Sequence, residues 1–156
     1  MLVTAKFDLH PELPNRRPNE LFSSTDCIYH KNGYIKPCKL FTFTLTNGKS
    51  VTWNYNKFFD CDSKNVLYIL ICNNCDYFYL GKTIDFKQRI RKHKSDVKHP
   101  QNSTCRECAE HLRDCAKIEP FFQIYPFYHE KDHYLRDYKE KRFIITWKPP
   151  LNINKT

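Results

Sequence analysis

Two short apolar runs separated by a few polar residues constrain the fold of this chain more than any other feature. The runs, 66–72 and 77–81, are rich in β-branched and aromatic residues. Such a pair predicts a β-hairpin. Gly81 closes the second run, and its lack of a side chain gives the backbone room to turn tightly into the next element. The hairpin is therefore the expected centre of the fold.

The turn of this hairpin decides which side chains meet. Both asparagines of the dipeptide 73–74 tolerate positive φ, so a two-residue turn is expected there. In that register Tyr68 faces Tyr79, and Cys72 faces Cys75. Because side chains alternate along a strand, the two phenols are neighbours on one face, and the two thiols lie about 13 Å further along it.

A helix is expected directly after the hairpin. Asp85 suits the N-cap position, and an apolar stripe at helical spacing follows it: Phe86, Ile90 and Val97. Arg89 and His93 are four residues apart, so they project together from an adjoining face. A second helix, predicted over 106–117, places His111 and Cys115 one turn apart.

A third strand and a last helix complete the expected domain. The strand covers 121–125 and is closed by Pro126, and the helix runs from about 132 to 146 before Pro149-Pro150 stops it. Glu140 lies on the flank of this helix. Four of its apolar side chains are expected to point inward: Tyr134, Leu135, Tyr138 and Ile145.

The expected domain covers residues 65–156, and the residues before it form two further segments. Residues 1–24 combine prolines with basic residues and predict a basic extended arm. Residues 25–64 contain two β-rich runs around Asn47-Gly48, which is a strong hairpin signal, and Cys27, Cys38 and Cys61 bracket them. A mixed α and β fold with an N-terminal β-hairpin extension is expected.

Charge and cysteine content narrow the function classes. Lys and Arg number 26 against 17 Asp and Glu, a formal net charge of +9, which favours a nucleic-acid partner. The chain has no apolar run of about 18 residues and no signal-like N-terminus, so no membrane association is expected. We expect an intracellular protein, and a nuclear one if the source is eukaryotic.

Eight cysteines in a reducing compartment point to metal rather than to disulfides. The preferred zinc ligands combine the hairpin pair with the second helix: Cys72, Cys75, His111 and Cys115. Cys105 and Cys108 form a second Cys-x-x-Cys pair and are the alternative donors. A third reading, buried cysteines without metal, stays open.

Five motifs in order resemble those of the GIY-YIG nuclease family. They are Val66-Leu67-Tyr68, Tyr79-Leu80-Gly81-Lys82-Thr83, Phe86-x-x-Arg89-x-x-x-His93, Glu140-x-x-Phe143-Ile144 and Leu151-Asn152. The first motif departs from the family by Val-Leu in place of Gly-Ile, and the second by Leu80. The Cys72/Cys75 pair, His111 and the ending Lys148–Asn152 are similar to the endonuclease modules of Penelope-like retroelements.

The resemblance implies an α/β (α+β) module with a three-stranded antiparallel sheet flanked by helices, which cuts DNA with one divalent metal, Mg²⁺ or Mn²⁺. It implies that Tyr68 is the general base or its relay, with a pKa lowered by Arg89 and the metal. Tyr79 would orient the water, Arg89 would grip the phosphate, and Glu140 would bind the metal.

Other interpretations of these residues stay open. The tyrosine pair also suits simple sheet packing, Arg89 a solvated helix face, and Glu140 an ion pair with Arg136. His93 would hydrogen-bond Tyr79 or the phosphate, or bind zinc. Asn152 would be a structural hydrogen-bonder near the cleft rather than a reacting group.

The favoured function is a metal-dependent DNA endonuclease serving or derived from a mobile element, with a structural zinc ion and no small-molecule cofactor. The alternative is a catalytically silent, zinc-containing module that binds nucleic acid. A full set of catalytic residue types favours the enzyme.

Overall fold

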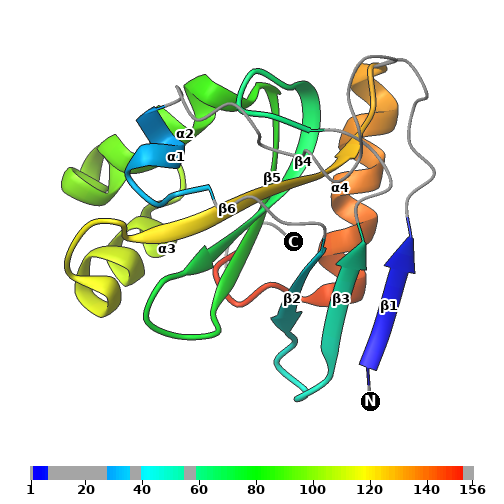
Figure 1. The fold of residues 1–156 in the computed structure, drawn as a ribbon, viewed down its shortest axis with the longest axis horizontal. Coiled ribbons are helices and arrows are strands. Elements are labelled where there is room, and N and C mark those ends of the chain that lie inside the picture. The colour runs from blue at the N-terminus through cyan, green and yellow to red at the C-terminus, as the bar shows by residue number, and fades with distance from the viewer. Residues whose placement is uncertain (1, 7–27, 36–39, 55–58, 153–156) are drawn as a thin grey trace.

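A three-stranded antiparallel sheet forms the centre of the computed structural model, which describes residues 2–6, 28–35, 40–54 and 59–152 (Figure 1). The strand order is β5-β4-β6. The strands are β4 (Lys64–Cys72), β5 (Phe78–Asp85) and β6 (Phe122–His129). Helices flank the sheet on both sides, as expected for the fold class (Figure 1).

The β4–β5 hairpin is present, but its predicted register is wrong by two residues. Tyr68 pairs with Gly81, and Tyr79 pairs with Leu70. The turn is longer than two residues, because the Cys72 amide donates to the Tyr77 carbonyl at 2.9 Å. Asn73 is engaged elsewhere: its backbone amide donates to the Phe121 carbonyl, so it extends the contact with the β6 side instead of forming the turn. Since the shift is even, Tyr68 and Tyr79 still share one face and lie diagonally.

Gly81 has a different purpose from the predicted one. It does not end its strand, since β5 continues to Asp85. A Cβ atom at Gly81 would overlap Oη and Cζ of Tyr68 and Cε1 of Tyr79. The missing side chain therefore makes room for the Tyr68 ring to lie across the partner strand.

The third strand also runs further than predicted. β6 passes through Pro126, which pairs with Tyr68, and ends at His129. An edge strand tolerates a proline because one side of it makes no ladder hydrogen bonds. The register between β4 and β6 shifts between Leu67 and Tyr68, next to this proline.

Helix α2 (Phe86–Lys98) follows β5 as predicted. The Asp85 carboxylate accepts a hydrogen bond from the Gln88 amide and caps the helix, and the predicted apolar stripe is buried: Phe86, Ile90 and Val97. The 3₁₀ turn η2 (Pro100–Asn102) leads into α3 (Arg106–His111), which continues as the π-helical turn η3 (Leu112–Ala116).

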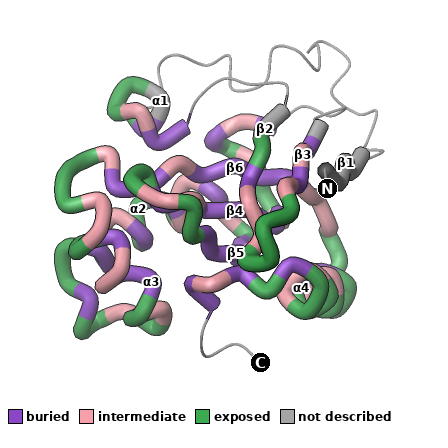
Figure 2. Tube along the Cα trace, turned by 90° about the horizontal axis from the view of Figure 1, so that it is seen from below, coloured by how far each residue is buried: buried purple, intermediate pink, exposed green. Residues whose placement is uncertain are grey.

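Helix α4 (His133–Trp147) has the predicted extent but not the predicted inner face. The four apolar residues expected inside are exposed: Tyr134 (82%), Leu135 (48%), Tyr138 (54%) and Ile145 (65%). Arg136, Glu140 and Trp147 are buried instead. Much of α4 is coloured as exposed in Figure 2. The helix is rotated so that Glu140 faces the sheet.

The predicted N-terminal hairpin is confirmed as β2 (Leu40–Thr44) and β3 (Ser50–Asn54), which pair antiparallel. A short strand, β1 (Leu2–Lys6), pairs parallel with β3, and α1 (Ile28–Lys31) precedes the hairpin. The rest of the predicted arm, and Cys27 and Cys38, lie outside the described residues.

An aromatic cluster joins the small sheet to the main domain. Trp53 of β3 lies 4.9 Å from Phe127 of β6 and 5.6 Å from Trp147 of α4, measured between ring centroids. Phe43 of β2 lies 4.9 Å from Phe78 of β5. Because these rings are buried, the hairpin and the C-terminal end of α4 share one core with the main sheet. Within the described residues, no helix has the length and apolar character needed to cross a membrane.

Candidate active site

Five residues named from the sequence come from four elements, of which β4, α2 and α4 all pack on the fourth, β5. Tyr68 lies on β4, Tyr79 on β5, Arg89 and His93 on α2, and Glu140 on α4. Four of the five are buried, and Arg89 is half-buried. The rings of Tyr68, Tyr79 and His93 lie against one another. The charge of Arg89 lowers the pKa of the Tyr68 phenol, and that of Glu140 raises it.

The Tyr68 hydroxyl and His93 are in direct hydrogen-bond contact. Oη of Tyr68 lies 2.7 Å from Nε2 of His93, a buried hydrogen bond. The ring centroid of His93 lies 5.5 Å from that of Tyr79. The partners expected for His93 from the sequence were Tyr79, a phosphate or zinc. In the observed register the hydrogen-bond partner of His93 Nε2 is the Tyr68 hydroxyl.

Burial dominates the electrostatics of the two phenols. Desolvation raises the pKa of Tyr68 well above its usual range, and the Arg89 guanidinium lowers it by a smaller amount. Burial, followed by the charges of Tyr68 and Cys105, also raises the pKa of Tyr79. Burial therefore keeps both phenols neutral near pH 7, and a Tyr68 pKa lowered by Arg89 together with a bound metal stays a prediction.

A partly buried hydrogen-bonded chain that sequence reasoning missed reaches Tyr79 from α2. The Asp96 carboxylate accepts from Lys92 Nζ at 2.6 Å and from the Ser103 hydroxyl at 2.9 Å. The Ser103 hydroxyl oxygen accepts from the Cys105 amide at 2.9 Å, and Cys105 Sγ lies 3.1 Å from Tyr79 Oη. The spacing of Lys92 and Asp96 was visible in the sequence, but it is equally typical of a surface ion pair.

Glu140 faces β5 from the inner side of α4. Nζ of Lys82 lies 4.0 Å from Oε1 of Glu140 and forms a closer ion pair with Asp137, one turn earlier. Arg136 donates instead to the backbone carbonyl of Glu130 at 3.0 Å. Two carboxylates of α4, Asp137 and Glu140, therefore face the ammonium group of Lys82 on β5.

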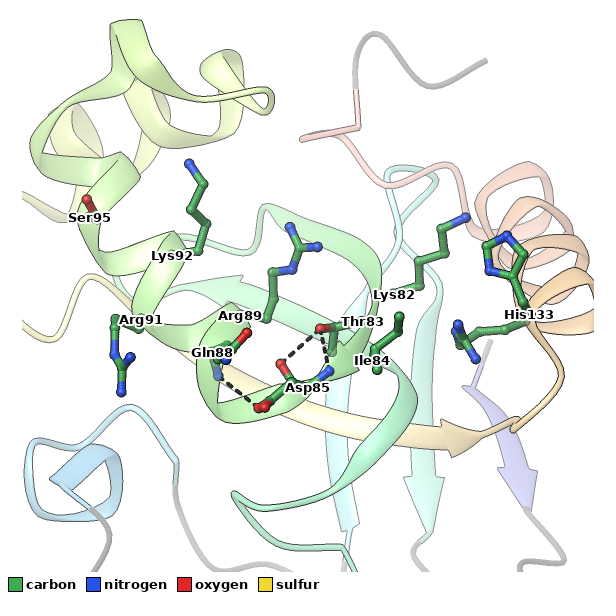
Figure 3. Close-up of a pocket in the computed structure, with 11 residues that line it drawn as sticks. Lys82, Thr83, Ile84, Asp85, Gln88, Arg89, Arg91, Lys92, Ser95 and His133 are labelled. Atoms are coloured by element: carbon green, nitrogen blue, oxygen red, sulfur yellow. Dashed lines mark hydrogen bonds between the residues drawn. The ribbon is translucent and has the colours of Figure 1, made fainter.

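A pocket with a volume of about 1010 Å³ opens between β5, α2 and the start of α4, and of the five residues Arg89 lines it. Its lining is strongly basic and includes Lys82, Arg89, Arg91, Lys92 and Arg136, together with His133 and a single carboxylate, Asp85. Figure 3 shows Lys82, Arg89 and Lys92 extending from β5 and α2 toward the same side. Such a lining is complementary to phosphate groups.

Asn152 joins the C-terminal segment to β5. Its side-chain oxygen accepts from the Leu80 amide at 2.9 Å, and its side-chain nitrogen donates to the Leu80 carbonyl at 2.8 Å. Both groups of its amide are thus used to hold the backbone next to Tyr79 and Gly81. This arrangement is that of a structural hydrogen-bonder.

The four preferred zinc ligands also meet, at the hairpin turn. The ligand atoms of Cys72, Cys75, His111 and Cys115 all lie within 4.8 Å of one another. Sγ of Cys75 is 3.2 Å from Nε2 of His111, and the Tyr77 ring stacks on that imidazole at 5.0 Å. The alternative donors, Cys105 and Cys108, lie on or beside α3, where Cys105 contacts Tyr79 instead.

The protonation of this cluster follows its burial. Desolvation raises the pKa of Cys72 to about 12 and also raises that of Cys75, while a hydrogen bond from Asn74 lowers that of Cys115. Burial lowers the pKa of His111, which favours the neutral imidazole that metals bind. A cation would relieve the burial cost of the thiolates.

The model of the GIY-YIG catalytic domain matches residues 64–153, more than half of the chain. The chain therefore belongs to the GIY-YIG family, a family of nuclease-type hydrolases, and a nuclease domain implies a DNA substrate. The comparisons with curated proteins and with solved structures gave no match.

Proposed function

We propose that this chain is a metal-dependent DNA endonuclease that hydrolyses phosphodiester bonds. The proposal is supported by the packing of Tyr68 and Tyr79 on His93, beside a basic pocket that Arg89 lines and whose Lys82 lies 4.0 Å from Glu140. These groups come from four separate elements, so simple sheet packing of the tyrosines does not account for their meeting. Hydrolysis needs such groups, because the water must lose a proton and the phosphorane must be stabilised.

The neutral state of Tyr68 assigns it the part of a proton relay. A buried phenol with a raised pKa is a poor resting base, but its hydroxyl can take a proton from water while it passes its own to Nε2 of His93. Tyr79, on the same face, would orient the water. Arg89 would hold two non-bridging phosphate oxygens as a fork, which a lysine cannot reproduce.

Glu140 would hold the divalent cation. Its carboxylate is buried, lies beside the basic pocket and already attracts the Lys82 ammonium, so it fits a hard cation that keeps several waters. When bound, Mg²⁺ or Mn²⁺ would supply Lewis-acid stabilisation of the phosphate charge.

The cysteine cluster at the hairpin turn supports a structural zinc ion. Three thiols and one imidazole with mutually close ligand atoms match a closed tetrahedral site. Zinc would join the β4–β5 turn to η3. Metal analysis of purified protein should find about one zinc per chain, and a Cys72→Ser/Cys75→Ser variant should lose it; equal, negligible zinc in both would end the idea.

The nuclease proposal is tested by nicking of supercoiled plasmid with Mg²⁺. Glu140→Ala should abolish nicking while it largely keeps DNA binding, and Arg89→Lys should lower the rate by at least about 100-fold. If wild-type protein binds DNA but does not nick it, whichever divalent ion is added, the chain is a silent binding module instead.

The mobile-element role rests on the resemblance of the cysteine pair, His111 and the C-terminal motif to Penelope-like endonuclease modules. In that setting the enzyme would nick chromosomal DNA for integration, which would place it in the nucleus of a eukaryotic host. Location of a tagged chain in eukaryotic cells tests this part separately.

A further inference from the structure

The exposed apolar side chains of α4 are not scattered at random around the helix. Tyr134 and Tyr138 are one helical turn apart, so they project side by side. We call this pair the tyrosine rim. Tyr134 is the most exposed large hydrophobic residue among those described, at 82%. Single exposed apolar residues are ordinary, but adjacent aromatic rings in water indicate a binding partner.

The tyrosine rim adjoins the basic pocket. His133, which precedes Tyr134, lines the pocket, and the two ring centroids are 5.4 Å apart. Asp137, which precedes Tyr138, pairs with the pocket residue Lys82. Figure 3 places His133 on the α4 side of the pocket, across from the side chains of α2. A ligand that runs out of the pocket over the start of α4 would meet Tyr134 first, next to His133, and Tyr138 one helical turn further along.

Charge and shape together identify the kind of ligand. The pocket lining carries five Lys or Arg side chains and one carboxylate, which suits a polyanion. An apolar peptide or a lipid tail would not need these cations. A nucleic acid uses both features, because phosphates contact the cations while bases stack on aromatic rings.

The bases must be unpaired to use the rings. In a duplex the faces of the bases are covered by their neighbours, so an exposed tyrosine can stack only on a nucleotide that has left the helix. We propose that the tyrosine rim binds unpaired nucleotides next to the phosphate held in the pocket. The substrate class is then DNA with a single-stranded segment beside the cleavage point. This inference rests on the proposed nuclease function.

The experiment measures DNA binding by fluorescence anisotropy in Glu140→Ala protein, so that cleavage does not interfere. Two labelled DNAs of the same sequence are compared, a full duplex and a duplex with a single-stranded branch. The branched DNA should bind about tenfold more tightly. A Tyr134→Ala/Tyr138→Ala change should remove that preference and leave duplex binding unchanged, because stacking is lost while the phosphate contacts stay.

Two further variants make the result specific. Tyr134→Phe/Tyr138→Phe keeps the rings and should keep the preference. Leu135→Ala removes an exposed apolar side chain that neighbours the rim but has no aromatic ring, and it should change nothing. Equal binding of both DNAs by the parent protein, or a retained preference in the double alanine variant, would overturn the proposal.

The outcome is separable from that of the nuclease proposal. If wild-type protein never nicks DNA but the tyrosines still confer the preference, only the catalytic proposal fails. If it nicks duplex and branched DNA equally and the rim has no effect on binding, the enzyme stands and the rim does not.

Discussion

Helices α2 and α4 flank the same site but are built on opposite principles. α2 buries the apolar stripe that its sequence predicts and adds two polar groups, His93 and Asp96, to its inner face. α4 buries Arg136 and Glu140, while its apolar residues are in water. The apolar pattern therefore identifies the inner face of α2, which carries its site residue His93 among buried apolar side chains, but it does not identify the inner face of α4.

The two helices must also be held in place by different contacts. Burying a charged side chain costs free energy unless partners compensate it, so the inner face of α4 adds little stability. Its anchor is the C-terminal end, where the Trp147 ring packs 4.7 Å from that of Phe143 and 5.1 Å from that of Phe43. α2, by contrast, is held along its length by apolar burial.

The anchor of α4 gives the largest expected effect. Trp147→Ala should lower the free energy of unfolding by about 3–5 kcal/mol, because it removes a buried aromatic ring. Tyr138→Ala on the same helix should change it by less than about 0.5 kcal/mol. Denaturant titration measures both. Similar losses would mean that the outer face of α4 is packed.

An isoleucine on each helix compares them directly. Ile90 of α2 is fully buried and Ile145 of α4 is 65% exposed. Ile90→Ala should cost about 2–5 kcal/mol of unfolding free energy, while Ile145→Ala should cost less than about 0.5 kcal/mol. A reversed order in chemical denaturation would contradict the orientation of α4.

The buried carboxylate of Asp96 on α2 gives a smaller expected change in the free energy of unfolding. Asp96→Asn should cost about 1–3 kcal/mol, because Asp96 accepts hydrogen bonds from Lys92 and Ser103 in a buried place. Asp62→Asn is the matched control, since its ion pair with Lys87 on the same helix is exposed and is worth under about 1 kcal/mol. Equal effects in thermal unfolding would show that Asp96 is not a structural acceptor.

The smallest expected effect concerns the pH dependence of Asp137, a half-buried carboxylate of α4. Hydrogen bonds from Lys82 and Lys141 lower the pKa of Asp137 to about 2. Because this value is below that of the unfolded chain, near 3.9, the stabilisation is present above about pH 4 and is lost as the pH falls to about 2. It should stay under about 1 kcal/mol, since water screens the pair.

Urea denaturation of wild-type protein and Asp137→Asn at neutral pH and near pH 2 measures this contribution. Their difference in unfolding free energy should shrink on acidification. A difference that grows instead would mean that another group carries the pH dependence.

The sequence predicted local structure well because local structure depends on neighbouring residues. The Asn47-Gly48 hairpin, the Asp85 cap and the apolar stripe of α2 each need only residues close by in the chain. The register of the β4–β5 hairpin failed because Asn73 contacts Phe121, which is distant in sequence. Cys105 likewise meets Tyr79 only after α3 has folded beside the sheet.

By itself the sequence determined the family, through five ordered motifs, and it named the side chains that meet at the site. Only the tertiary structure decided which face of α4 is buried, that Tyr68 lies across Gly81, and that His93 bonds Tyr68. Motifs record which residue types are present, whereas orientation and hydrogen-bond pairing depend on packing between elements far apart in the chain.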